Sequence, residues 1–77
     1  MNNARRKELD KIQEQLMDLQ TSLAELKDEE QECYDNLPEG IQDSERGEAM
    51  ESAVESMEAA YDNIQDAIDN ILEAMGV

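Results

Sequence analysis

The stretch YDNLPEGIQDSERG, residues 34–47, decides the fold, because it is the one place where a long helical pattern is interrupted. It contains the chain's only proline, Pro38, and two of its three glycines. A proline cannot continue a helix, and it pushes the residue before it, here Leu37, out of the helical region. Gly40 tolerates the positive φ that chain reversals often require. The stretch therefore predicts a turn over residues 36–43.

Apolar residues on both sides of this turn recur at alternating spacings of three and four, the period of a coiled coil. Before the turn they are Leu9, Ile12, Leu16, Leu19, Leu23, Leu26, Cys33 and Leu37. After it they are Met50, Val54, Met57, Tyr61, Ile64, Ile68, Ile71 and Met75. The pattern predicts one helix over about residues 3–35 and a second over about residues 44–75, with Asp43 or Ser44 as the cap of the second.

The two apolar series fit each other if the chain folds back at Gly40. With Leu9 as heptad position a, every a position then faces a d position of the other helix. The pairs are Leu9 with Ile71, Ile12 with Ile68, Leu16 with Ile64, Leu19 with Tyr61, Leu23 with Met57 and Leu26 with Val54. This register predicts an all-α antiparallel helical hairpin, a single domain over residues 1–77. Cys33, at d, is expected to be a packed thiol, and Glu30, at a, interrupts the apolar series.

A chain of 77 residues buries little surface, and proteins of this size usually gain stability from disulfides, a metal or self-association. Cys33 is the only cysteine and there is no histidine, so self-association is the expected source. The second helix has Ala53, Ala60, Ala67 and Ala74 at every seventh position, all at g. Such a series is either a set of good helix formers or a seam against which a second copy packs. The second interpretation predicts a homodimeric four-helix bundle.

The outward positions of the second helix are strongly acidic. They are Glu48, Glu51, Glu55, Glu58, Asp62, Asp66, Asp69 and Glu73, and no basic residue follows Arg46. Exposed helices usually interleave lysine with glutamate, so this helix lacks the stabilisation of such pairs. The acids either solvate the helix or form a surface that binds a basic partner. Two copies would carry about −30 over roughly 50 Å, a density comparable to that of duplex DNA.

Composition excludes several functions. The net charge of −15, from 21 acids and 6 bases, argues against direct binding of nucleic acid or an anionic membrane. No apolar run is long enough to span a membrane, and the N-terminal residues do not form a signal peptide, so a cytoplasmic location is expected. We find no catalytic residues, metal ligands or cofactor motif. Residues 35–46 have the glycine of an EF-hand loop, but Leu37 and Arg46 occupy ligand positions.

One resemblance adds to these expectations. The stretch YDNLPEGIQDSERGEAMESAVESMEAAYDNIQDAIDNIL resembles small uncharacterised acidic helical-hairpin proteins of phages and integrative elements of Gram-positive bacteria. The similar part is roughly residues 25–75, and its most specific element is the turn from Asn36 to Arg46, an N-[LIM]-P-E turn followed by SER. The resemblance implies an accessory protein of a mobile element, within that class an inhibitor of host defence, and it assigns no functional residues.

The sequence therefore favours a protein that is not an enzyme. We expect an interaction module that binds and inhibits a basic or nucleic-acid-binding host protein through an acidic, DNA-mimicking face. The alternative is a small structural or assembly protein, a scaffold or chaperone-like phage component whose acids serve solubility. A carboxylate-bridged metal enzyme would require Glu-x-x-His motifs inside the bundle, which a chain without histidine does not have.

Overall fold

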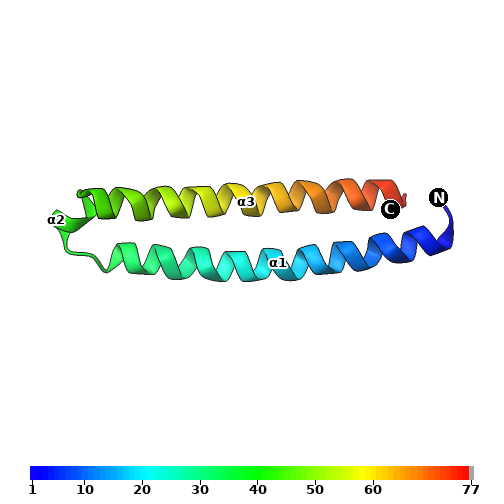
Figure 1. Ribbon diagram of the computed structural model, residues 1–77, viewed down its shortest axis with the longest axis horizontal. Helices are drawn as coiled ribbons and strands as arrows, with labels where there is room; N and C mark the ends of the chain where they lie inside the picture. The colour runs from blue at the N-terminus through cyan, green and yellow to red at the C-terminus, as the bar shows by residue number, and fades with distance from the viewer. Residues whose placement is uncertain (77) are drawn as a thin grey trace.

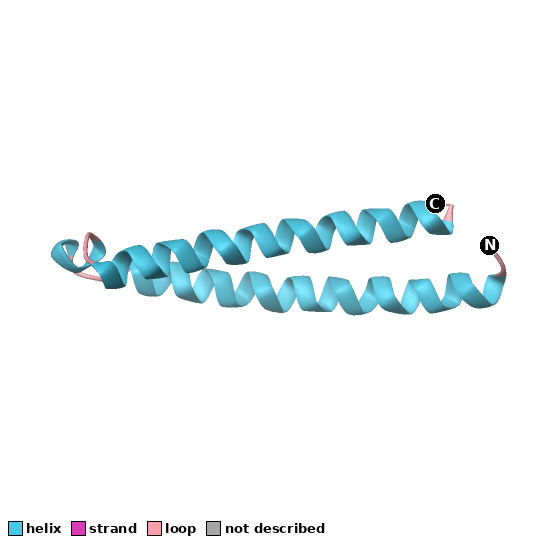
Figure 2. Cartoon of the chain, turned by 45° about the horizontal axis from the view of Figure 1, so that its top comes forward, coloured by secondary structure: helices cyan, strands magenta, loops and turns pink. Residues whose placement is uncertain are grey.

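The computed structural model describes residues 1–76 as three helices: α1 (Asn3–Asp35), α2 (Glu39–Gln42) and α3 (Glu45–Met75). Figure 1 shows α1 and α3 lying side by side and antiparallel, with α2 at one end and both termini at the other. Figure 2 gives the same arrangement from a second direction, with loops only at the two ends of the rod. The chain is an all-α helical hairpin, 58 × 14 × 14 Å. Val77, the last residue of the predicted domain, lies outside the described residues.

Hydrogen bonds at both ends of α1 explain its limits. At the start, the side-chain oxygen of Asn2 accepts a hydrogen bond of 2.8 Å from the backbone N–H of Arg5, which satisfies a donor that has no partner inside the helix. At the other end, the carbonyl of Tyr34 accepts from the backbone N–H of Leu37 at 3.1 Å and from Nε2 of Gln42 at 3.0 Å. The turn thus caps the helix that it follows.

The reversal is built around the one-turn helix α2. Pro38 is its N-cap, and the Pro38 carbonyl accepts from the backbone N–H groups of Ile41 at 2.9 Å and Gln42 at 3.0 Å. Gly40 lies inside α2, and the one positive φ among the described residues belongs to Gly76. The prediction that Gly40 supplies a positive φ is therefore wrong, because a helical turn, which needs only negative φ, makes the reversal.

The glycine that this turn requires is Gly47, in the first turn of α3. Gly47 is buried, and a Cβ there would overlap the carbonyl of Gln42 and lie 2.6 Å from the carbonyl oxygen of Ile41. Ser44 is the N-cap of α3, and its Oγ accepts from the backbone N–H of Gly47 at 3.5 Å. The chain can therefore turn directly into α3 only because residue 47 has no side chain.

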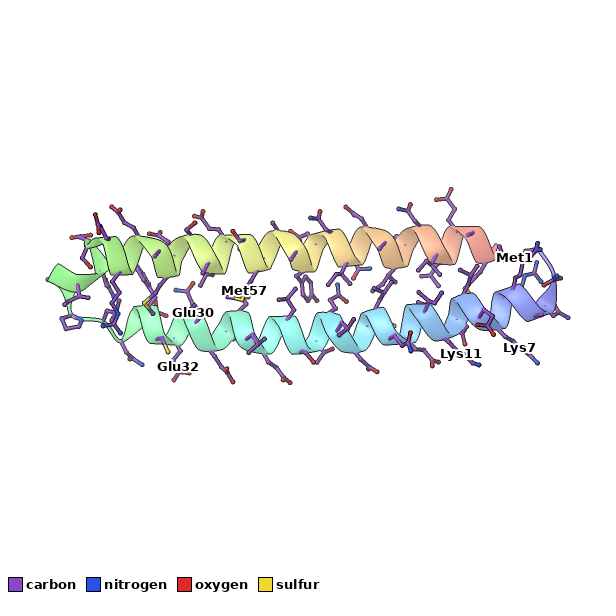
Figure 3. The ribbon with its side chains drawn as sticks, in the orientation of Figure 1. Met1, Lys7, Lys11, Glu30, Glu32 and Met57 are labelled. Atoms are coloured by element: carbon purple, nitrogen blue, oxygen red, sulfur yellow. The ribbon has the colours of Figure 1, made fainter. Side chains whose placement is uncertain are left out.

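The core is a single layer of side chains between α1 and α3. Val54 and Ile68 of α3 are its most covered apolar residues, 8% and 4% exposed. The buried and half-buried residues of α3 beyond its first turn are Met50, Ala53, Val54, Met57, Ala60, Tyr61, Ile64, Ala67, Ile68, Ile71, Leu72 and Met75. Those of α1 are Leu9, Gln13, Leu16, Gln20, Leu23, Ala24, Lys27, Glu30 and Tyr34. Figure 3 shows Glu30 and Met57 in this layer, whereas Glu32 points away from it.

The predicted a/d seam is wrong for α1. Ile12, Leu19 and Leu26 are 44%, 59% and 56% exposed, and Cys33 is exposed rather than packed. The helix is turned about its axis, so that the a positions face α3 together with residues four further along: Gln13, Gln20, Lys27 and Tyr34. Long amphipathic side chains can enter such a layer because their stems are apolar and their polar ends reach its edge. The apolar d positions are left outside.

Candidate interaction surfaces

The acidic face of α3 is the most strongly charged surface. All eight predicted residues are exposed: Glu48, Glu51, Glu55, Glu58, Asp62, Asp66, Asp69 and Glu73. Within residues 1–76 the one ion pair joins Nζ of Lys27 to Oδ1 of Asp28, at 3.8 Å. The described part of the chain therefore leaves all eight carboxylates without a basic partner. Asp69 alone among them accepts a side-chain hydrogen bond, 3.0 Å from Nε2 of Gln65, and this bond leaves its charge in place.

The charge density of one hairpin is lower than that of DNA. A net charge of −15 along a rod of 58 Å is about one charge per 4 Å, against roughly one per 1.7 Å for duplex DNA. Two hairpins side by side would carry about one charge per 2 Å over the same length. A DNA-like density on this scaffold therefore depends on self-association.

Charge is also distributed unevenly along α1. Residues 1–11 contain four bases and two acids, whereas residues 25–35 contain six acids and one base. Lys7 and Lys11 lie on the outer side of α1 near the termini (Figure 3).

At the turn end the pKa of the Tyr34 hydroxyl is raised above 10.0, first by burial against its neighbours and then by the negative charges of Glu51, Asp43 and Asp35. The hairpin is thus basic at the terminal end of α1 and acidic at the turn.

The alanines proposed as a dimer seam lie at the edge of the layer between the helices. Ala53, Ala60 and Ala67 are half-buried within the hairpin, and Ala74 is exposed. α1 therefore covers part of this series, so the alanines do not form an open stripe along the whole of α3.

A series of exposed apolar residues lies on the other helix. We call Ile12, Leu19, Leu26 and Cys33, at every seventh position of α1, the outer stripe. Sequence reasoning assigned these residues to the hairpin core because the d positions of two helices are normally matched. The signal that could have separated them is Gln20: an amide able to bond across the seam favours an orientation that buries it and exposes the d positions.

The Gln20 side chain hydrogen-bonds α1 to α3. It is 8% exposed, and its Nε2 donates to Oε1 of Gln65 at 3.0 Å and to the carbonyl of Tyr61 at 3.4 Å. The sequence assigned no role to Gln20, so this contact was missed. Buried polar groups that are fully bonded define one arrangement of the elements around them, and Gln20 defines both the rotation of α1 and its level along α3.

Residues 1–76 have no pocket and no group of three or more acidic, cysteine or histidine side chains placed to hold a metal ion. None of the helices in this range is long and apolar enough to cross a membrane.

Comparison of the chain with protein-family models, with curated proteins and with solved structures found no match.

Proposed function

We propose that this chain is a non-enzymatic interaction module of a phage or mobile element, which binds and inhibits a basic, nucleic-acid-binding host protein through the acidic face of α3. The observation that carries the proposal is the set of eight exposed carboxylates on one straight helix, with no ion pair to any described residue. Unpaired acids at helical spacing repel each other and reduce stability by a few tenths of a kcal/mol per pair. A surface that reduces stability in this way is expected to have been selected for binding.

Rigidity supports the proposal. α3 is 31 residues, about 46 Å long, and its inner side is held by α1 along its length. A preformed surface binds without an ordering cost. A rod of this length with negative charge along one side is similar to a nucleic-acid backbone in the sign of its charge, and two such rods side by side approach its charge density. The similarity of residues 36–46 to turns in phage and integrative-element proteins agrees with an origin in a mobile element.

A second candidate, a small structural or assembly protein of a phage, is favoured by the outer stripe. Its exposed isoleucine and leucines would bind another subunit through apolar contacts. The two functions differ in their response to salt, because apolar contacts persist at high ionic strength, whereas contacts between exposed charges are screened.

The test is capture of host proteins on the immobilised full chain at about 50 mM salt, followed by washing at about 500 mM, where the screening length falls to a few Å. We expect the partner to be basic, to be released by the wash and to be displaced by duplex DNA. The charge-reversed variant carries Glu55→Lys, Asp62→Lys, Asp66→Lys and Asp69→Lys, and it is expected to capture none of it. These residues are exposed, so helicity measured by circular dichroism should be unchanged.

The matched control reverses four exposed acids of α1: Asp10→Lys, Glu14→Lys, Asp18→Lys and Glu25→Lys. Both variants change the net charge by the same amount, so a difference between them locates the binding surface. We expect the control to retain most of the binding. Equal loss in both variants would show that only net charge matters. A partner held at about 500 mM salt, or bound by the charge-reversed variant, would favour the assembly protein.

A further inference from the structure

The outer stripe has no partner within the chain. Ile12, Leu19 and Leu26 span about 21 Å of α1 at 1.5 Å per residue, and about half of each side chain is exposed. Among residues 1–76, Val54 and Ile68 are the only buried residues with an apolar side chain. The chain therefore leaves outside the hairpin three of the large side chains from which a stable core would be made.

The exposed area indicates how much surface remains to be covered. A compact monomer of 8.7 kDa exposes about 4,700 Å² by the usual scaling of surface with mass. This chain exposes 5655 Å², an excess of about 900 Å². A standard protein interface buries about 800 Å² on each partner. Contact with one further molecule on one face would therefore lower the exposed surface area of the chain to about that of a compact protein.

The charges of α1 indicate that this further molecule is a second copy of the chain, with its α1 antiparallel to the first. The basic segment, residues 1–11, and the acidic segment, residues 25–35, lie on either side of the centre of the outer stripe. Two α1 helices in antiparallel orientation place the basic segment of each beside the acidic segment of the other. A parallel pair would place the two acidic segments together.

We propose that two copies of this chain pair through their outer stripes, with the two α1 helices antiparallel and the two-fold axis beside Leu19. In this register Leu19 faces Leu19 of the second copy, and Ile12 faces Leu26. The two α1 helices make the interface, and the half-buried alanines of α3 are not at its centre. The acidic residues of α3 point away from it.

The interface is tested first by mass and by substitution. Sedimentation equilibrium of the full chain at micromolar concentration is expected to give twice the monomer mass of 8.7 kDa. Leu19→Lys should raise the dissociation constant roughly tenfold or more, since it places two charges at the centre of the interface. The matched control is Met17→Lys, because Met17 is 48% exposed on α1 but two residues from Leu19 and so on the opposite side. A monomer mass for the unaltered chain, or equal effects of the two substitutions, would overturn the proposal.

The orientation is tested by cross-linking, which does not depend on a disruptive change. In a Cys33→Ser background, Leu19→Cys should form a disulfide between chains under mild oxidation, because the two-fold axis brings the two thiols together. Native Cys33 should not, since its two copies would be about 42 Å apart along the antiparallel helices. Ala60→Cys in the same background should also remain unlinked. Cross-linking mainly through Cys33 would show a parallel pair, and cross-linking mainly through Ala60 would place the second copy against α3; either result contradicts the proposal.

Discussion

At the scale of single residues, two glycines of the turn have opposite requirements. Gly40 lies in α2, and a Cβ there would meet no atom within 4 Å. Gly47 lies where α3 begins, and its Cα faces the carbonyls of Ile41 and Gln42 so closely that no side chain fits. Glycine composition alone marks both as turn residues, yet only one is required by sterics. The requirement comes from close approach of two backbone segments and not from a positive φ.

Gly47→Ala is expected to reduce the free energy of unfolding by about 1–3 kcal/mol, because backbone must move to accommodate the methyl group. Gly40→Ala is the matched control. It should leave the free energy of unfolding unchanged or raise it by about 0.4–1 kcal/mol, because alanine lowers the conformational entropy of the unfolded chain. Urea denaturation followed by circular dichroism at one fixed protein concentration measures both. Equal stabilities of the two variants would show that the turn differs from the one described.

At the scale of the element, the orientation of α1 depends on a few polar contacts. The helix has apolar residues at a and d, a stripe that one neighbouring helix could cover in an a/d register. Gln20 enters the seam because the Gln65 amide and the Tyr61 carbonyl accept from its side chain. Lys27 and Tyr34 enter on the same side. The d residues consequently face solvent.

Gln20→Ala is expected to destabilise the hairpin by about 1–2 kcal/mol, since it removes both hydrogen bonds and leaves the Gln65 carbonyl oxygen without its donor. Gln15→Ala, an exposed site in the same helix, has the same change in helix propensity and should shift stability by less than about 0.5 kcal/mol. Thermal or urea unfolding of the two variants separates the buried amide from the exposed one. If Gln15→Ala costs as much as Gln20→Ala, the amide bridge does not stabilise the hairpin.

At the scale of the whole molecule, a narrow rod carries a charge that its fold does not neutralise. The net charge is −15, and among residues 1–76 the single ion pair, Lys27 with Asp28, joins adjacent positions of one helix. Such an exposed pair contributes well under 1 kcal/mol. The core opposes this repulsion with one layer of side chains. Stability is therefore expected to depend on ionic strength as well as on apolar burial.

Raising sodium chloride from about 50 mM to about 500 mM should raise the melting temperature by roughly 5 °C, because screening weakens repulsion between exposed acids. Chloride is preferred to sulfate, which strengthens apolar burial directly. The four-lysine variant of α3 is the control: each substitution adds two charges, so its net charge is about −7 and its rise should be smaller. An equal rise in both proteins would assign the salt effect to something other than repulsion.

The sequence by itself determined the helices and the reversal between them. Pro38 ends one helical pattern, and the 3.5-residue period of leucines and isoleucines makes each long helix amphipathic. The sequence left Asp43 or Ser44 as the cap of the second helix, and the structure has Ser44 in that place. These are local effects, since the spacing, the cap and the missing N–H act within a few residues. The exposure of the eight acids on α3 also followed from their spacing.

Only the tertiary structure decided which side of α1 faces α3. A helix with a seven-residue repeat has several adjacent faces. Heptad matching does not show whether the face that buries the d-position leucines is more stable than the face that buries Gln20 with its two hydrogen-bond acceptors. The same holds for Gly47, whose requirement arises from the approach of α2 to the start of α3. In both cases the deciding contacts join groups on different elements, so the outcome depends on distances that exist only once the chain has folded back on itself.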